Sequence, residues 1–199
     1  MDIQSAYAKL RGSVEALTVA LDERDAYTRT HCDRVVVLAA ELGRACNVSN
    51  RDLDLLHLGA LFHDVGKIGI PDSVLLKPSA LNREEWIVMK SHAERGERII
   101  RSTVLDLADE LAPIIRHHHE SFAGSGYPDG LKGEQIPLLS RILLVADSYD
   151  AMGTSRPYHQ ARTHREVMAV LESENGDKID PDVFLKFTRL IDRSPARVH

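Results

Sequence analysis

The pentapeptide HDVGK, from His63 to Lys67, places an imidazole next to a carboxylate. An imidazole nitrogen binds one metal ion, whereas a carboxylate can bridge two. Further donors of these kinds follow or precede it along the chain: His31, His92, the run His117-His118-His119-Glu120, and Asp147. A lone histidine is more often a core or surface residue than a ligand, and we interpret His57, His117, His164 and His199 in that way. Burying the other donors together without a cation would leave large desolvation costs unmet, so the set predicts a metal site.

A pair of divalent ions suits the hydrolysis of a phosphodiester, because the ions neutralise the phosphate and acidify a bridging water. Such a site needs no protein nucleophile, and the sequence offers no persuasive Ser-His-Asp or Cys-His arrangement. Imidazole and carboxylate donors suit iron, manganese or zinc better than magnesium or calcium. We expect Asp64 to be the bridging carboxylate. Lys67 follows it by three residues and could reach a phosphate oxygen, with an ion pair to Asp64 or Asp72 as the alternative.

The segment GSGYPDG, from Gly124 to Gly130, is too rich in glycine to be packing material. Its Tyr127 could hydrogen-bond a phosphate or stack on a guanine, while Pro128 fixes the turn. Further on, Arg156 in SRPY offers a planar fork that suits a phosphate or a guanine edge. These residues predict a substrate-binding region beside the metal site.

In this order and with these flanking residues, the chain resembles the HD-GYP family, the cyclic di-GMP phosphodiesterase branch of the HD superfamily of metal-dependent phosphohydrolases. The resemblance covers residues 24 to 187 and implies hydrolysis of cyclic di-GMP to pGpG, with further cleavage to GMP left open. It implies two divalent transition-metal ions, iron or manganese first and zinc as the alternative. It assigns metal ligation to His31, His63, Asp64, His92, His118, His119 and Asp147, catalysis to Asp64 and Lys67, and substrate binding to Lys67, Gly126, Tyr127, Pro128, Arg156 and His159.

Within this resemblance, His31, His63 and Asp147 would complete one metal, as in the HD superfamily at large. His92 and His118 would complete the second, and His119 would join the second site or a third. Adjacent histidines on a helix point about 100° apart, so His118 and His119 need not serve the same ion.

Two positions depart from the family pattern. Tyr27 stands where some members carry a glutamate that helps to hold a third metal, so we expect two metals. His159 stands where a basic residue is common, which predicts weaker substrate binding or a more acidic optimum. Around the ligands, we expect Asp25 and Asp150 to hydrogen-bond the histidines, and Glu120 to orient a ligand or anchor the loop.

Two other functions stay open. The fold could serve as a cyclic-dinucleotide sensor without turnover, although degenerate members of the family usually lose one of the motifs that are intact here. The chain could also be a phosphohydrolase of another nucleotide, such as a mixed cyclic dinucleotide. Cyclic di-GMP is the expected partner, and a diguanylate cyclase (GGDEF) or another signalling protein is a further candidate.

The elements that must position these residues are helical. Apolar spacing predicts an all-α fold of about seven helices, without a convincing strand, and an irregular loop over residues 120–137. The resemblance implies that these helices form an HD-domain bundle. Capping pairs are expected at Ser49 with Asp52, Asn82 with Glu85, and Thr163 with Glu166, and Asp180-Pro181 opens the last helix. Gly66 is suited to end the helix that carries HDVGK, and a helix from 105 to 119, kinked or started late at Pro113, carries the triple histidine. The helix after Asn82 is expected to turn Trp86, Met89 and Ala93 to its apolar side.

The 199 residues, 43% hydrophobic and 28% charged, predict one phosphohydrolase domain over 25–192 and a frayed tail over 193–199. Residues 1–24 carry Leu10, Val14, Leu17 and Leu21 with the spacing of a coiled-coil seam, which predicts a homodimer, or a helix packed on its own domain as the alternative. The net charge of −5 argues against binding of a nucleic-acid polymer. The sequence shows no signal peptide or membrane-spanning stretch, so we expect a cytoplasmic protein in which Cys32 and Cys46 are free thiols.

Overall fold

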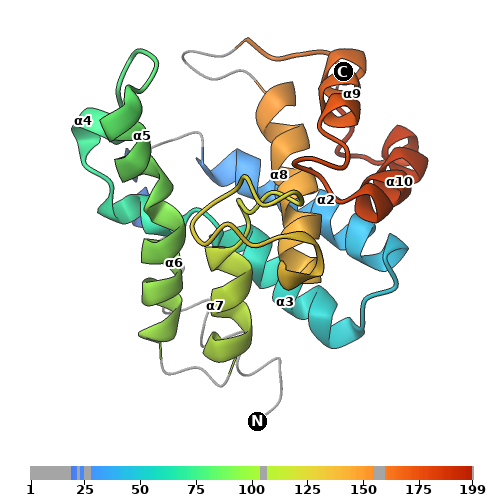
Figure 1. Cartoon of the computed structure of the whole chain (residues 1–199), viewed down its shortest axis with the longest axis horizontal. Coiled ribbons are helices and arrows are strands. Elements are labelled where there is room, and N and C mark those ends of the chain that lie inside the picture. Colours follow the sequence, from blue (N-terminus) through green and yellow to red (C-terminus); the bar gives the residue numbers. More distant parts are fainter. Residues whose placement is uncertain (1–18, 22, 25–27, 104–106, 155–159, 199) are drawn as a thin grey trace.

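The computed structural model describes residues 19–21, 23–24, 28–103, 107–154 and 160–198. This part of the chain is helical and contains no named strand, only an isolated bridge between Asn175 and Ile179 (Figure 1). The predicted all-α class is therefore confirmed. The described residues form nine α-helices and three short 3-10 helices, where about seven helices were expected.

The α-helices are α2 (Thr28–Ala45), α3 (Asn50–Phe62), α4 (Asp72–Leu75), α5 (Arg83–Lys90), α6 (His92–Arg101), α7 (Ala108–Arg116), α8 (Leu138–Gly153), α9 (His164–Ser173) and α10 (Pro181–Leu190). The 3-10 helices are η1 (Val65–Gly69), η2 (Gly133–Gln135) and η3 (Ile191–Arg193).

Side-chain caps start several of these helices where the sequence predicts them. The Ser49 side chain accepts from the backbone N–H of Asp52, and the Asp52 carboxylate accepts from the backbone N–H of Ser49, which satisfies two unpaired donors at the start of α3. The same reciprocal pair opens α5 at Asn82 and α9 at Thr163. Asp180 caps α10 ahead of its N1 proline.

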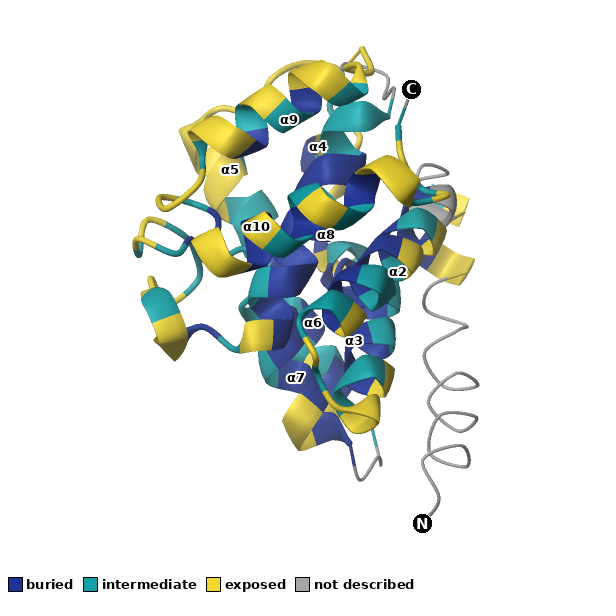
Figure 2. Ribbon diagram, turned by 90° about the vertical axis from the view of Figure 1, so that its right-hand side faces the viewer, coloured by how far each residue is buried: buried dark blue, intermediate teal, exposed yellow. Residues whose placement is uncertain are grey.

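The core lies around α8, which is the most deeply buried helix and packs against α2, α3, α7, α9 and α10. Figure 2 shows its dark blue ribbon at the centre of the molecule, with more exposed residues on α5 and α9. Two segments distant in sequence, α2 and α8, lie against each other. On the other side, α6 packs against α7 and η1. The burial of the apolar side chains between these helices is the main contribution to the stability of the fold.

The expected helix over 105–119 is wrong at its C-terminal end. α7 stops at Arg116 and His117 is its C-cap, so His118 and His119 lie in a tight turn in which the N–H of Glu120 bonds the carbonyl of His117 at 3.0 Å. The helical angle between neighbouring residues therefore does not apply to the two histidines. The late start at Pro113 is also wrong, because the described helix begins at Ala108 and Pro113 lies inside it.

The expectation for Gly66 is also wrong. α3 ends at Phe62, before HDVGK, and Gly66 lies inside η1. A Cβ atom at Gly66 would lie 1.9 Å from the carbonyl oxygen of His92 and 2.5 Å from the backbone nitrogen of Gly96. Gly66 thus permits η1 to touch the backbone of α6, and this contact brings Asp64 close to His92.

The two chain ends contact the domain. Leu21 is buried, with 1% of its surface exposed, and Arg24 donates to the carbonyls of Ile68 and Ile70 at 2.6 and 2.9 Å. Residues on the N-terminal side of the boundary expected after residue 24 therefore contact the domain. In the tail that was expected to fray over 193–199, the N–H of Val198 bonds the Tyr149 hydroxyl at 3.1 Å.

Three smaller expectations concern surface and thiols. Trp86 is 48% exposed rather than packed in the core, whereas Ala93 is buried on α6. Cys32 is buried, Cys46 is half-buried, and neither forms a disulfide bond in the described part of the chain, as predicted. None of the helices in the described ranges is long and apolar enough to cross a lipid bilayer.

Candidate metal centre

Four buried histidines from different elements converge on one place. His31 comes from α2, His63 is the C-cap of α3, His92 opens α6, and His118 follows α7. In each, Nδ1 has a partner 2.6 to 2.8 Å away: Asp150 for His31, and the carbonyls of Ala60, Met89 and Ile115 for His63, His92 and His118. These partners accept from Nδ1–H, so the neutral form of each ring carries its lone pair on Nε2.

The Nε2 atoms are suited to metal ligation. Nε2 of His63 is buried and has no hydrogen-bond partner, and a buried polar atom without one is costly. A bound cation would satisfy it. The residues present therefore fit a metal site.

The donors form two clusters. In the first, which we call cluster A, ligand atoms of His31, His63 and Asp147 lie within 4.8 Å of one another. Nε2 of His31 is 3.1 Å from Oδ1 of Asp147, and Nε2 of His63 is 3.8 Å from the same oxygen. Asp147 reaches this place from α8, which packs on α2.

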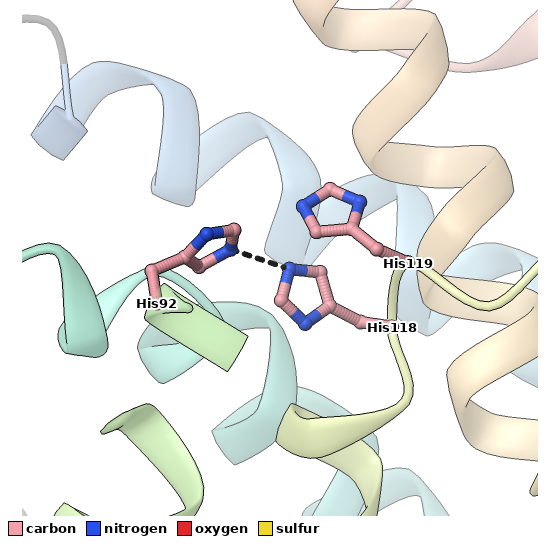
Figure 3. A group of neighbouring side chains, drawn as sticks. All are labelled: His92, His118 and His119. Carbon is pink, nitrogen blue, oxygen red and sulfur yellow. Dashed lines mark hydrogen bonds between the residues drawn. The ribbon is translucent and has the colours of Figure 1, made fainter. Parts of the chain in front are cut away.

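Cluster B consists of His92, His118 and His119, again with ligand atoms within 4.8 Å. Figure 3 shows the three rings together. Nε2 of His92 lies 3.4 Å from Nε2 of His118. The turn after α7 presents both His118 and His119 to His92, because the chain has left the helix. The structure thus groups His119 with the second set of donors and not apart from it.

Asp64 lies between the clusters. Its Oδ2 atom is 3.4 Å from Nε2 of His63 in cluster A, and its Oδ1 atom is 3.5 Å from Nε2 of His92 in cluster B. The two oxygens of one carboxylate therefore face different clusters, as a bridging ligand would. Lys67 donates to Oδ2 of Asp64 at 2.6 Å, so of the two ion pairs considered for this lysine the structure shows the one with Asp64.

The clusters differ in charge. Burial opposes protonation of His31, but its hydrogen bonds to Asp147 and Asp150 outweigh this and raise its pKa to about 9. Burial also opposes ionisation of Asp64, yet the neighbouring Lys67 and His63 hold its pKa well below the usual range. In cluster B, burial and then the neighbouring histidines lower the pKa of His118 to about 3. Cluster B is therefore neutral at pH 7, the state in which imidazole binds a metal.

A second layer of side chains holds His31 in place. Asp150 has no exposed surface, and its Oδ2 accepts from Nδ1 of His31 at 2.7 Å. Arg34 donates to both oxygens of Asp150, at 2.5 and 3.0 Å, and to the Thr154 hydroxyl. The predicted contact of Asp150 is confirmed, whereas Asp25 lies outside the described residues. Sequence reasoning missed Arg34, although its place three residues after His31 was a usable signal.

The clusters lie in the wall of a cavity of about 520 Å³, within the range of small-molecule sites. Of the expected substrate-binding residues in the described ranges, Lys67 and Tyr127 line this cavity, whereas Gly126 and Pro128 do not. Arg156 and His159 lie outside the described residues. The ring of Tyr127 lies against His119, with centroids 4.9 Å apart.

Gly126 has a packing role. A Cβ atom there would lie 2.2 Å from the backbone nitrogen of Ser121, so the loop can approach this backbone only with glycine. Glu120, which is buried, accepts from the N–H groups of Asp129, Gly130 and Leu131 at 2.7 to 3.1 Å. The expectation that Glu120 anchors the loop is confirmed.

Comparison with known proteins places this arrangement in a family. Residues 15–183 of the chain match the HD domain family. The chain is an HD domain protein.

Curated relatives agree with this assignment. The chain is 39% identical over 171 residues to the cyclic di-GMP phosphodiesterase response regulator RpfG of Xanthomonas campestris pv. campestris, covering 86% of this chain and 45% of that protein. It is 39% identical over 180 residues to a cyclic di-GMP phosphodiesterase of Thermotoga maritima, covering 89% and 48%. The resemblance to the HD-GYP family is confirmed. The chain spans about half the length of the curated relatives that it matches.

Another relative carries a different substrate in its name. The 3'3'-cGAMP-specific phosphodiesterase 3 of Vibrio cholerae is 34% identical over 188 residues, covering 94% of this chain and 40% of that protein. Two solved structures share the fold. A cyclic GMP-AMP-specific phosphodiesterase of V. cholerae has a TM-score of 0.67 at 23% identity, covering 89% and 47%, and Bd1817 of Bdellovibrio bacteriovorus has 0.70 at 18%, covering 96% and 65%.

The HD domain cavity also has walls that the motifs did not reveal. Besides the expected residues, it is lined by Leu75, Leu76, Lys77, Trp86, Met89, Ser148, Ala151, Met152 and Lys178. Trp86 and Lys77 stand outside the metal motifs, and Lys178 comes from the turn between α9 and α10. The exposure of Trp86 on a short helix is a signal that only the structure provides.

Proposed function

We propose that this HD domain hydrolyses a phosphodiester bond of cyclic di-GMP at a dinuclear metal centre. The position of Asp64 is the observation that carries the proposal, because its two oxygens face clusters A and B. In this assignment cluster A (His31, His63, Asp147) would hold one ion, cluster B (His92, His118, His119) would hold the other, and Asp64 would serve both. Iron or manganese suits these donors best, with zinc as the alternative.

Divalent ions bound there would neutralise the phosphate and lower the pKa of a bound water. Residues of the chain would bind and orient the substrate. Lys67 lines the cavity beside Asp64, where its ammonium adds positive charge toward a non-bridging phosphate oxygen. Tyr127 lines the cavity with its ring against His119, and its hydroxyl could hydrogen-bond the ligand. The first product of such a cleavage is the linear pGpG.

A second substrate has support of its own. Cyclic di-GMP phosphodiesterases and 3'3'-cGAMP-specific phosphodiesterases both occur among the relatives, at 39% and 34% identity. Their shared chemistry is a phosphodiester in a cyclic dinucleotide. We propose cyclic di-GMP as the preferred substrate and 3'3'-cGAMP as the competing one.

Turnover and metal content test the proposal together. Protein purified without oxygen and loaded with iron or manganese should contain two ions per chain. It should also convert cyclic di-GMP to pGpG, and chromatography measures this conversion. Parallel reactions with 3'3'-cGAMP compare kcat/KM for the two substrates. Less than one ion per chain would refute the dinuclear centre. Tight binding without any turnover would make the domain a sensor.

The bridging role of Asp64 is tested by Asp64→Ala. Because this carboxylate faces both clusters, the variant should lose both ions and at least a hundredfold in kcat, in line with the several kcal/mol that metal ions supply. Circular dichroism should stay helical. The matched control is Asp54→Ala, an exposed position on α3. Turnover by Asp64→Ala near the parent rate would refute the assignment.

A further inference from the structure

Helix α5 carries apolar side chains that do not serve the core. Four of its eight residues, from Trp86 to Met89, are apolar, yet α5 has no buried residue. Trp86 is 48% exposed and Ile87 is 64% exposed. Large exposed apolar side chains in a group mark a contact surface more often than chance.

One face of α5 belongs to the cavity of the metal centre. Trp86 and Met89, three residues apart, both line it, together with Leu75 and Leu76 from the preceding segment. Ile87 does not line the cavity, so it provides a matched position on the same helix. The cavity therefore combines a buried ligand set with an exposed aromatic wall.

The charges of the cavity suit an anion. Lys67, Lys77 and Lys178 line it, while its carboxylates, Asp64 and Asp147, belong to the metal clusters. Lys77 is held by Glu85, the residue before Trp86, with Nζ 2.5 Å from Oε2. An ammonium thus lies on the side of the cavity formed by α5. A phosphate ester with a heteroaromatic ring suits this cavity. Its phosphate would face the metal ligands and the ammonium groups, and its ring would lie on the flat apolar wall.

We propose that Trp86 binds the substrate by stacking on one base of the cyclic dinucleotide while the phosphodiester lies over clusters A and B. This inference rests on the proposed function and deepens it, because it assigns the base contact. Stacking of a base on an aromatic side chain is sequence-tolerant and, by alanine substitution, changes affinity about tenfold or more per base. The contact would thus favour nucleotides over phosphodiesters without a base.

Fluorescence tests the contact directly, because Trp86 is the single tryptophan of the chain. Zinc-loaded protein avoids quenching by a paramagnetic ion. Cyclic di-GMP should quench the emission in a saturable titration, excited at the red edge of the indole band where guanine does not absorb. Inorganic phosphate, which can bind the metals but has no base, should leave the emission unchanged. Saturable binding of cyclic di-GMP by calorimetry without quenching would overturn the inference.

Variants supply the second arm. Trp86→Ala should raise KM for cyclic di-GMP about tenfold with kcat and metal content retained, and Trp86→Phe should restore most of the affinity. Ile87→Ala should behave as the parent. An unchanged KM for cyclic di-GMP in Trp86→Ala would overturn the inference. Turnover of cyclic di-GMP by the same variant would still support the proposed function. Quenching without hydrolysis would instead support the base contact and refute the proposed activity.

Discussion

At the scale of single residues, the partners of Nδ1 decide what the site can do. Three backbone carbonyls and one carboxylate accept from the Nδ1 atoms of His31, His63, His92 and His118, which leaves every Nε2 facing the centre. A neutral imidazole oriented in this way can bind a metal without rearrangement. The residue types alone do not fix this orientation, because each ring has two nitrogens.

The contact between His31 and Asp150 leads to a prediction. Asp150→Asn keeps an oxygen near Nδ1 but removes the charge that raises the basicity of His31 and that Arg34 pairs with. We expect about tenfold weaker metal affinity, at the low end of what such partners contribute. Competition with a chelator of known affinity measures this loss, and Asp54→Asn on the exposed side of α3 is the control. Unchanged affinity would limit Asp150 to a structural role.

At the scale of elements, the loop after α7 depends on one buried carboxylate. Glu120 accepts from three successive N–H groups, of Asp129, Gly130 and Leu131, and so fixes the loop that holds Tyr127 over His119. A buried carboxylate with several backbone donors replaces the regular hydrogen bonding that an irregular segment lacks.

Glu120→Gln should therefore destabilise the domain. One oxygen becomes an amino group that faces an N–H donor, so we expect a loss of about 1 to 3 kcal/mol in the free energy of unfolding. Urea denaturation measures the loss, and amide exchange should quicken at residues 129–131. Glu134→Gln, an exposed position in η2, is the control. Equal stability of the two variants would contradict the anchoring role.

A second contact of the loop makes stability depend on pH. Arg116 on α7 donates to both oxygens of Asp129 at 2.7 Å, and this bond outweighs burial and lowers the pKa of Asp129 to about 2. A carboxylate with a lowered pKa stabilises the fold above its unfolded pKa and loses that effect as pH falls toward the folded value.

The stability difference between the parent and Asp129→Asn should thus shrink as pH falls from the ordinary pKa of 3.8 to about 2. The difference should be small, because the pair is partly exposed. Urea unfolding of both proteins across this range measures it, and comparing the two removes the titration of the metal ligands. A difference that does not change with pH would refute the ion pair as its source.

At the scale of the whole molecule, cluster A joins residues that are far apart in sequence. His31 and Asp147 meet because α2 packs on α8. Leu21 near the start of the chain is buried in the same molecule, so of the four residues predicted to form a dimer seam this one is already covered. Leu10, Val14 and Leu17 lie outside the described residues, and the homodimer stays a prediction.

A shortened chain tests that prediction. A protein that begins at Val19 retains Leu21 and the bonds of Arg24 but lacks Leu10, Val14 and Leu17. If these residues pair two chains through apolar burial, light scattering should give a monomer for the shortened protein and a dimer for the full chain. Equal masses would favour packing of the first helix on its own domain.

The sequence by itself determined the helical class, the caps of α3, α5, α9 and α10, and the family, because these depend on local patterns and on motifs with fixed residue types. It also named the donors of both clusters. Only the tertiary structure decided how the donors are shared. The turn after Arg116 places His119 beside His92, and Gly66 lets η1 touch α6 so that Asp64 faces both clusters. Such contacts depend on which backbones can approach each other, and that is set by packing between distant segments rather than by local pattern.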